Sequence, residues 1–141
     1  MTDHTPTAGG GIRPATIERI EGGAVLALAL AGTIALAPGL WWFPLAAFLV
    51  FDLSGLGYLR SPGAGAAAYN AVHTYTWPAL LGVASVVAGA AVPGAALWLG
   101  LVALAWAFHV GVDRALGYGL KLPDAFTHTH LGWIGKDRAR N

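Results

Sequence analysis

The chain has 141 residues, enough for one compact domain, and 56% of them are hydrophobic whereas only 11% are charged. This charged fraction is less than half of the roughly 25% that is usual in soluble domains. The formal net charge of +1 argues against a nucleic-acid partner, and the lack of cysteine excludes disulfides and thiolate metal ligands.

The charged residues are absent from two long stretches of the chain. Residues 22–51 and residues 61–112 contain no Asp, Glu, Lys or Arg. Both stretches exceed the roughly 20 apolar residues that a helix needs to cross a bilayer. We therefore predict an all-α, polytopic membrane protein, a four-transmembrane-helix bundle with a short cytoplasmic C-terminal segment that lies in a lipid bilayer.

The first half of the chain divides into a tail and two spans. Residues 1–13 are rich in Gly, Thr and Pro and are predicted to form a disordered tail. The first span begins near Pro14, a residue suited to the first turn of a helix, and ends before Pro38. The second runs from about residue 40 to residue 59 and opens with aromatic residues typical of the membrane interface.

The second half contributes two further spans and a tail. Residues 60–65 are predicted to form a turn, and the third span covers residues 66–92 with a kink at Pro78. The fourth span runs from about residue 95 to residue 116. The transmembrane domain thus covers 14–121, and the polar residues 122–141 form a C-terminal tail or lid.

The basic residues fix an orientation for these four spans. All eight of them fall on one side of the four-span arrangement: Arg13, Arg19, Arg60, Arg114, Lys121, Lys136, Arg138 and Arg140. The turns near Pro38 and Pro93, on the other side, contain none. The positive-inside rule therefore places both termini in the cytoplasm.

Ionisable side chains from three spans are predicted to lie at one depth. Asp52, His73 and His109 are each about 10 to 12 Å from the cytoplasmic end of their span, given the rise of an α-helix. Asp113 follows His109 by four residues, so the two share a helix face. Such groups are costly at membrane depth and normally face the protein interior, where they pair or bind something.

Imidazoles and carboxylates without thiols suit a divalent metal, with Zn²⁺ favoured and Fe²⁺ or Mn²⁺ as alternatives. The predicted ligands are Asp52, His73, His109, Asp113 and, if the tail folds back as a lid, His130. A metal that activates water there would make the protein a metal-dependent hydrolase of a lipid or another small membrane-soluble substrate. Asp113 and Arg114 are the predicted catalytic residues. The residues expected to support the ligands or hold an anionic headgroup are Glu21, Tyr69, Asn70 and Lys121.

The same residues are compatible with roles that need no metal. Each histidine alone could simply form a hydrogen bond to a helix carbonyl, and Asp113 with Arg114 could form an interfacial ion pair. His73 and His109 on neighbouring spans are also suited to bind one haem as axial ligands, for electron transfer. Asp52 and the two histidines are suited as well to a proton-coupled small transporter, which would require a homo-oligomer to form a pathway.

Five strings along the chain carry a resemblance: EGGAVL from Glu21, DLSGLGYL from Asp52, YNAVHTYTWPALL from Tyr69, HVGVDRALGYGLK from His109 and FTHTHLGWIG from Phe126. Over Glu18 to Gly135 the sequence resembles a family of small bacterial integral membrane proteins, the domain of unknown function four-two-six-zero. The resemblance implies the bacterial cytoplasmic membrane as location but implies no reaction. The positions matching its motifs are Glu21, Asp52, Tyr69, Asn70, His73, His109, Asp113, Arg114, Tyr118, Lys121, Thr129 and His130. His128 stands where the family pattern has an acidic residue.

Overall fold

The computed structural model describes residues 13–140. Four of its segments are long and apolar enough to cross a membrane, namely Pro14–Leu36, Pro38–Leu59, Pro62–Ala88 and Pro93–Leu116. Each begins with a proline, whose fixed φ and missing N–H suit the first turn of a helix. The predictions of an all-α fold with four spans and of a membrane protein are confirmed. Apart from Arg13, the tail predicted for residues 1–13 lies outside the described residues.

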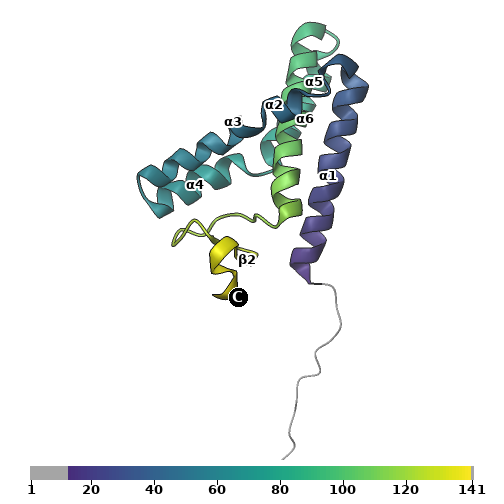
Figure 1. Cartoon of the computed structure of the whole chain (residues 1–141). Coiled ribbons are helices and arrows are strands. Elements are labelled where there is room, and N and C mark those ends of the chain that lie inside the picture. The colour runs from purple at the N-terminus through teal and green to yellow at the C-terminus, as the bar shows by residue number, and fades with distance from the viewer. Residues whose placement is uncertain (1–12, 141) are drawn as a thin grey trace, which may run out of the picture.

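The first and fourth spans form the central pair. Helices α1 (Pro14–Leu36) and α6 (Pro93–Leu116) run side by side in opposite directions (Figure 1). They meet at two glycines, because a Cβ atom placed on Gly22 would lie 2.9 Å from the carbonyl oxygen of Gly111, and one on Gly111 would lie 2.9 Å from the carbonyl oxygen of Gly22. Small residues allow such close contact between membrane helices.

The second span is a chain of short helical segments rather than one helix. It consists of η1 (Pro38–Leu40), α2 (Phe43–Ala46), α3 (Phe48–Asp52) and η2 (Leu53–Leu59), of which η1 and η2 are 3₁₀-helices. Pro44 lies inside the span and has no N–H to continue a ladder of hydrogen bonds. Helix α3 ends at Asp52, which is one of the predicted ligands.

The third span is broken between α4 (Pro62–Val72) and α5 (Thr76–Ala88). The kink predicted at Pro78 appears as a break at residues 73–75, one turn before the proline. A proline ring clashes with the carbonyl four residues before it, here that of Thr74, so the helix is interrupted there. The predicted turn 60–65 is also too long, because Ser61 caps α4 by accepting a hydrogen bond of 3.1 Å from the N–H of Ala64.

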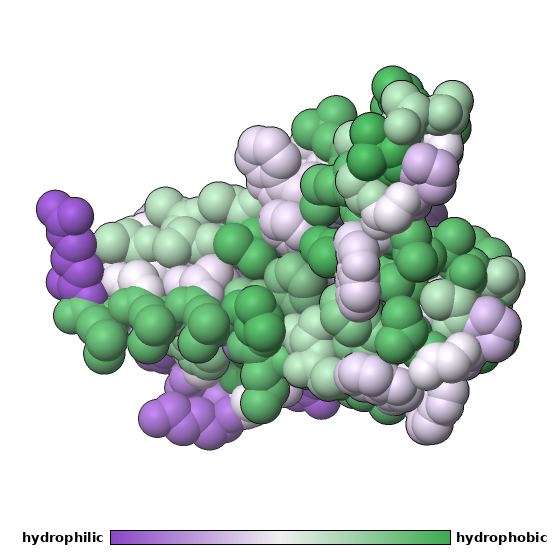
Figure 2. Space-filling view, turned by 90° about the horizontal axis from the view of Figure 1, so that it is seen from above, coloured by the Kyte–Doolittle hydropathy of each residue, from purple (hydrophilic) through white to green (hydrophobic). Residues whose placement is uncertain are grey.

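The helices form two groups. Helices α1 and α5 both pack on α6, while α3, η2 and α4 form a hairpin that projects sideways from α6 (Figure 1). Nine of the 24 residues of α6 are buried, more than in the other spans, so α6 is the centre of the fold. Viewed from above, the outer surface is mostly hydrophobic, with hydrophilic residues at its margins (Figure 2). This apolar surface fits a lipid bilayer.

The C-terminal segment folds back against the helices. Gly117 ends α6 with a φ of 92°, and the chain then forms the antiparallel strands β1 (His128–Thr129) and β2 (Gly132–Trp133) before the 3₁₀-helix η3 (Gly135–Arg140). The side chain of Asn70 on α4 holds this segment. Its Nδ2 donates to the carbonyl of Lys121 at 2.9 Å, and its Oδ1 accepts from the Lys121 N–H at 2.7 Å. Residues just after α6 are thereby pinned beside α4.

Candidate metal centre

Three ionisable side chains from three spans meet where the α3–α4 hairpin joins α6. Asp52 is the last residue of α3, His73 follows α4, and His109 lies on α6. Asp52 Oδ1 is 3.6 Å from His73 Nε2 and 3.7 Å from His109 Nε2, and the two Nε2 atoms are 3.0 Å apart. Both imidazoles are buried, whereas the Asp52 side chain is 44% exposed. The cluster is therefore closed on the protein side and open beside Asp52.

Asp113 extends this cluster by one group. Its Oδ2 lies 3.5 Å from His73 Nε2 and accepts a hydrogen bond of 2.6 Å from the hydroxyl of Tyr69. Asp113 is one helical turn after His109, as the i,i+4 spacing predicts. The structure thus brings together four of the five predicted ligands, Asp52, His73, His109 and Asp113.

The break in the third span allows His73 to reach the cluster, and three side chains compensate for it. Where the helix stops, the carbonyls of residues 71–73 lose their helical partners. Trp77 donates to Ala71 at 2.8 Å, Trp106 to Val72 at 2.8 Å, and Arg114 to His73 at 3.2 Å. Irregular backbone at membrane depth is tolerated only where its polar groups are satisfied in this way.

The two imidazoles are held differently. His73 Nδ1 lies 2.9 Å from the carbonyl of Tyr69, which can only accept, so Nδ1 carries the proton and Nε2 presents a lone pair to the cluster. A metal-ligating histidine characteristically donates its other N–H in this manner. His109 Nδ1 has no hydrogen-bond partner among residues 13–140, and the ring is fixed instead by packing against Phe48, with centroids 4.5 Å apart.

The separations fit the donor atoms of a small cation. Metal–ligand distances of 2.0–2.2 Å in a tetrahedral zinc site imply donor atoms about 3.3 to 3.6 Å apart. The three separations among Asp52 Oδ1, His73 Nε2 and His109 Nε2 run from 3.0 to 3.7 Å, and Asp113 Oδ2 lies 3.5 Å from His73 Nε2. The residues present therefore match the group in both chemistry and spacing. Asp52, His73 and His109 could hold such an ion, and Asp113 lies beside them, 3.5 Å from His73.

A cavity of about 250 Å³ opens beside the cluster. Its walls include both carboxylates of the cluster and Lys121, together with aromatic side chains, and the full lining is Phe48, Asp52, Tyr69, Asp113, Leu116, Tyr118, Lys121 and Phe126. Lys121 is only 3% exposed. Burial lowers the pKa of its ammonium group, and the negative charge of Asp113 acts in the opposite direction. The sequence predicted that Lys121 supports the ligands or holds an anionic headgroup but did not predict its burial, which accompanies the hydrogen bonds of its backbone to Asn70.

Two predicted site residues lie elsewhere. His130 is not with the other four ligands, because its Nε2 lies 3.2 Å from Glu18 Oε2 and its Nδ1 accepts from the N–H of Leu120 at 2.9 Å. Nε2 thus ties the C-terminal segment to α1, while Nδ1 binds the backbone within that segment. Arg114 donates to backbone carbonyls and lines a different cavity, with Glu21 and His130. It positions His73 from outside the cluster.

The remaining predicted residues have structural contacts. Glu21 lines the same cavity as Arg114, and Asn70 binds the backbone of Lys121. His128 lies 2.7 Å from Asp124 and stacks on Trp133. The hydrogen bond from His128 lowers the pKa of the Asp124 carboxyl below its ordinary value of 3.8.

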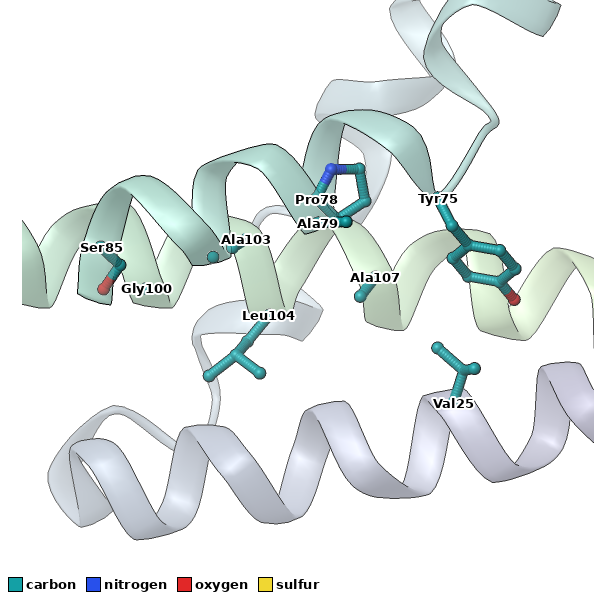
Figure 3. Close-up of a pocket in the computed structure, with 10 residues that line it drawn as sticks. Val25, Tyr75, Pro78, Ala79, Ser85, Gly100, Ala103, Leu104 and Ala107 are labelled. Atoms are coloured by element: carbon teal, nitrogen blue, oxygen red, sulfur yellow. The ribbon is translucent and has the colours of Figure 1, made fainter. Parts of the chain in front are cut away.

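Larger cavities lie away from the cluster and have apolar walls. One of about 400 Å³ lies between α1, α5 and α6, with Val25, Leu104 and Ser85 among the residues around it (Figure 3). Another of about 490 Å³ is lined by residues of α2, α3 and α6. Neither has a carboxylate or an imidazole in its walls, unlike the cavity beside the cluster.

Comparison with known proteins identifies a family but supplies no activity. No curated protein and no solved structure matches the chain. One family model matches residues 15–134, which include all four spans except the first residue of α1. All four proposed ligands and Lys121 lie within the matched region. The chain therefore belongs to the family described as Domain of unknown function (DUF4260).

Proposed function

We propose that Asp52, His73, His109 and Asp113 bind one divalent cation, with Zn²⁺ favoured and Fe²⁺ or Mn²⁺ as alternatives. The single observation that supports this is the convergence of Asp52 Oδ1, His73 Nε2 and His109 Nε2 from three spans at separations of 3.0 to 3.7 Å, with Asp113 Oδ2 3.5 Å from His73 Nε2. Burying two imidazoles and a carboxylate in a membrane protein is costly unless they pair or hold something.

We further propose a metal-dependent hydrolase that acts on a lipid or another membrane-soluble substrate. A divalent cation would lower the pKa of a bound water so that hydroxide forms near neutral pH. The cavity of about 250 Å³ gives a substrate access to Asp52 and Asp113. Asp113 and Tyr69, joined by a hydrogen bond of 2.6 Å, are placed to hold and return a proton beside it. Arg114 has the positioning role described above.

The proposed location is the bacterial cytoplasmic membrane with both termini in the cytoplasm. All eight Lys and Arg residues fall at the same end of the four spans, and this excess is characteristic of cytoplasmic loops. The centre would then lie in the cytoplasmic half of the membrane, and its cavity would open toward the C-terminal segment.

Geometry favours the metal centre over a haem. Two axial imidazoles must approach a haem iron from opposite faces of a planar macrocycle. Here the two Nε2 atoms are 3.0 Å apart, and Tyr69 stacks on His73 with ring centroids separated by 3.6 Å. A metal-free form has a second candidate function, proton-coupled transport, because the same 3.0 Å contact would then be a hydrogen bond between two histidines that lie beside Asp52 and Asp113.

Elemental analysis of the purified protein tests the proposal. We expect about one metal ion per chain in the wild type. A His73→Ala/His109→Ala double variant should lose it, whereas a His128→Ala/His130→Ala double variant, which removes two histidines outside the cluster, should keep it. A wild-type protein that stays metal-free after incubation with each of the three cations would contradict the metal centre and favour the proton relay. A Soret band in its absorption spectrum would favour haem.

A further inference from the structure

Lys121 places a buried positive charge in the wall of the cavity beside the cluster. Its Nζ lies 4.2 Å from the ring centroid of Phe126, 5.0 Å from that of Tyr69 and 5.7 Å from that of Tyr118. Within residues 13–140 no carboxylate lies within the 4.0 Å of Nζ that defines a salt bridge. Aromatic faces stabilise the ammonium without neutralising it. The charge is therefore free to bind an anion.

The net charge of the cavity determines when it attracts an anion. Asp52 and Asp113 contribute two negative charges and Lys121 one positive charge, so the cavity alone is negative overall. A divalent cation at the cluster would cancel the two carboxylates and leave the charge of Lys121 in excess. The cavity would then attract an anionic group, which would lie between the cation and the ammonium.

The shape and surroundings of the cavity indicate what carries the anion. Leu116 and Phe126 line it and are 56% and 55% exposed, so apolar side chains continue from the cavity to the outer surface. A molecule with an apolar body would contact these side chains while its charged group reaches Lys121. A phosphate group has oxygens pointing in several directions, so one can face the cation while another faces the ammonium.

We propose that the cavity binds the phosphate group of an amphiphile, with Lys121 as the residue that recognises its charge. This inference rests on the proposed metal centre and narrows its substrate class to phosphate-bearing lipids. Lys121 is a binding residue in this scheme, and the cluster supplies the second contact to the phosphate.

Binding measurements on zinc-loaded protein in detergent test the proposal. The probes are dihexanoyl phosphatidic acid, the uncharged dihexanoylglycerol with the same chains, inorganic phosphate, and hexanoate as a carboxylate. We expect phosphatidic acid to bind most tightly. Lys121→Met should weaken that binding by roughly tenfold to a hundredfold, the usual range for losing a charge-assisted hydrogen bond. Methionine keeps the apolar stem among the aromatic rings, and Lys121→Arg should retain most of the affinity.

The control variant is Lys136→Met, which removes an exposed lysine of η3 and should leave binding unchanged. Equal affinity of wild type and Lys121→Met for phosphatidic acid would overturn the proposal, as would equally tight binding of dihexanoylglycerol, inorganic phosphate or hexanoate. Metal content is measured on every sample. A failed metal centre therefore appears as missing zinc in the wild type, whereas a failed phosphate site appears as full zinc occupancy with no effect of Lys121→Met.

Discussion

Tyr69 is the residue that joins the proposed ligands to the rest of the fold. Its hydroxyl donates to Asp113 Oδ2 at 2.6 Å, its carbonyl accepts from His73 Nδ1 at 2.9 Å, and its ring stacks on His73 with an interplanar angle of 9°. The hydroxyl orients one ligand and the carbonyl fixes the protonation of another. Partners of this kind behind the ligands contribute strongly to metal affinity.

Tyr69→Phe removes only the hydroxyl and keeps the stacked ring and the carbonyl. We expect it to weaken zinc binding by about tenfold to a hundredfold without unfolding the protein, measured by competition with a chelating dye. Tyr58→Phe is the matched control, because the Tyr58 hydroxyl is buried without a hydrogen-bond partner in the described part of the chain. Its removal should leave zinc affinity unchanged and the melting temperature equal or higher. Equal zinc affinities of the two variants would show that the Tyr69 hydroxyl does not support the site.

Single residues also show how far the sequence could predict the site. Asp52, His73 and His109 could be placed at one depth because helix rise and span ends determine depth. The contact of His130 with Glu18 could not be predicted, since it joins residues separated by 112 positions through a tail that has no helical period. The burial of Lys121 was missed for the same reason.

At the scale of elements, the close contact between α1 and α6 fixes the position of α6, which carries His109 and Asp113. A Cβ atom on Gly22 would lie 2.5 Å from Arg114 Cβ and 2.8 Å from the backbone nitrogen of Ala115. The contact therefore lies beside Asp113. Gly23, its neighbour, has open space around the corresponding position.

Gly22→Ala should force α1 away from α6 and destabilise the protein by about 1–3 kcal/mol, the usual cost of overpacking. Gly23→Ala should be neutral or stabilising by up to about 1 kcal/mol, because alanine favours a helix more than glycine does. Thermal unfolding in detergent measures both. A Gly22→Ala variant as stable as Gly23→Ala would mean that the helices do not meet at these glycines.

The elements also differ in how well the sequence predicted them. The four spans follow from runs of apolar residues, although three of them begin two to four residues before the predicted starts, at Pro38, Pro62 and Pro93. The break after α4 lies one turn before Pro78, the proline that predicted it. Its stability depends on donors from Trp77, Trp106 and Arg114, and the latter two belong to α6. Partners that come from another helix leave no local signal in the sequence of the broken one.

Over the whole molecule, the spans carry the exposed apolar side chains and the C-terminal segment carries half of the basic residues. The spans expose large hydrophobic side chains such as Leu49 and Val86, which are 72% and 81% exposed. The C-terminal segment lies below the α3–α4 hairpin beside the end of α6 (Figure 1), and it carries four of the eight basic residues. The proposed centre lies near that basic end, so the orientation of the chain decides which leaflet supplies its substrate.

This orientation is testable because the chain contains no cysteine. We expect Gly39→Cys and Gly94→Cys, at the end without basic residues, to react with a membrane-impermeant maleimide in intact cells. Both glycines have open space around the position of a Cβ atom, so the substitutions should leave the fold intact. Ala139→Cys, in η3, should react only after the membrane is permeabilised, because basic segments stay on the cytoplasmic side. The reverse pattern would place the centre and Lys121 at the outer face. Phosphate-bearing lipids would then have to reach the cavity from the outer leaflet rather than from the inner one.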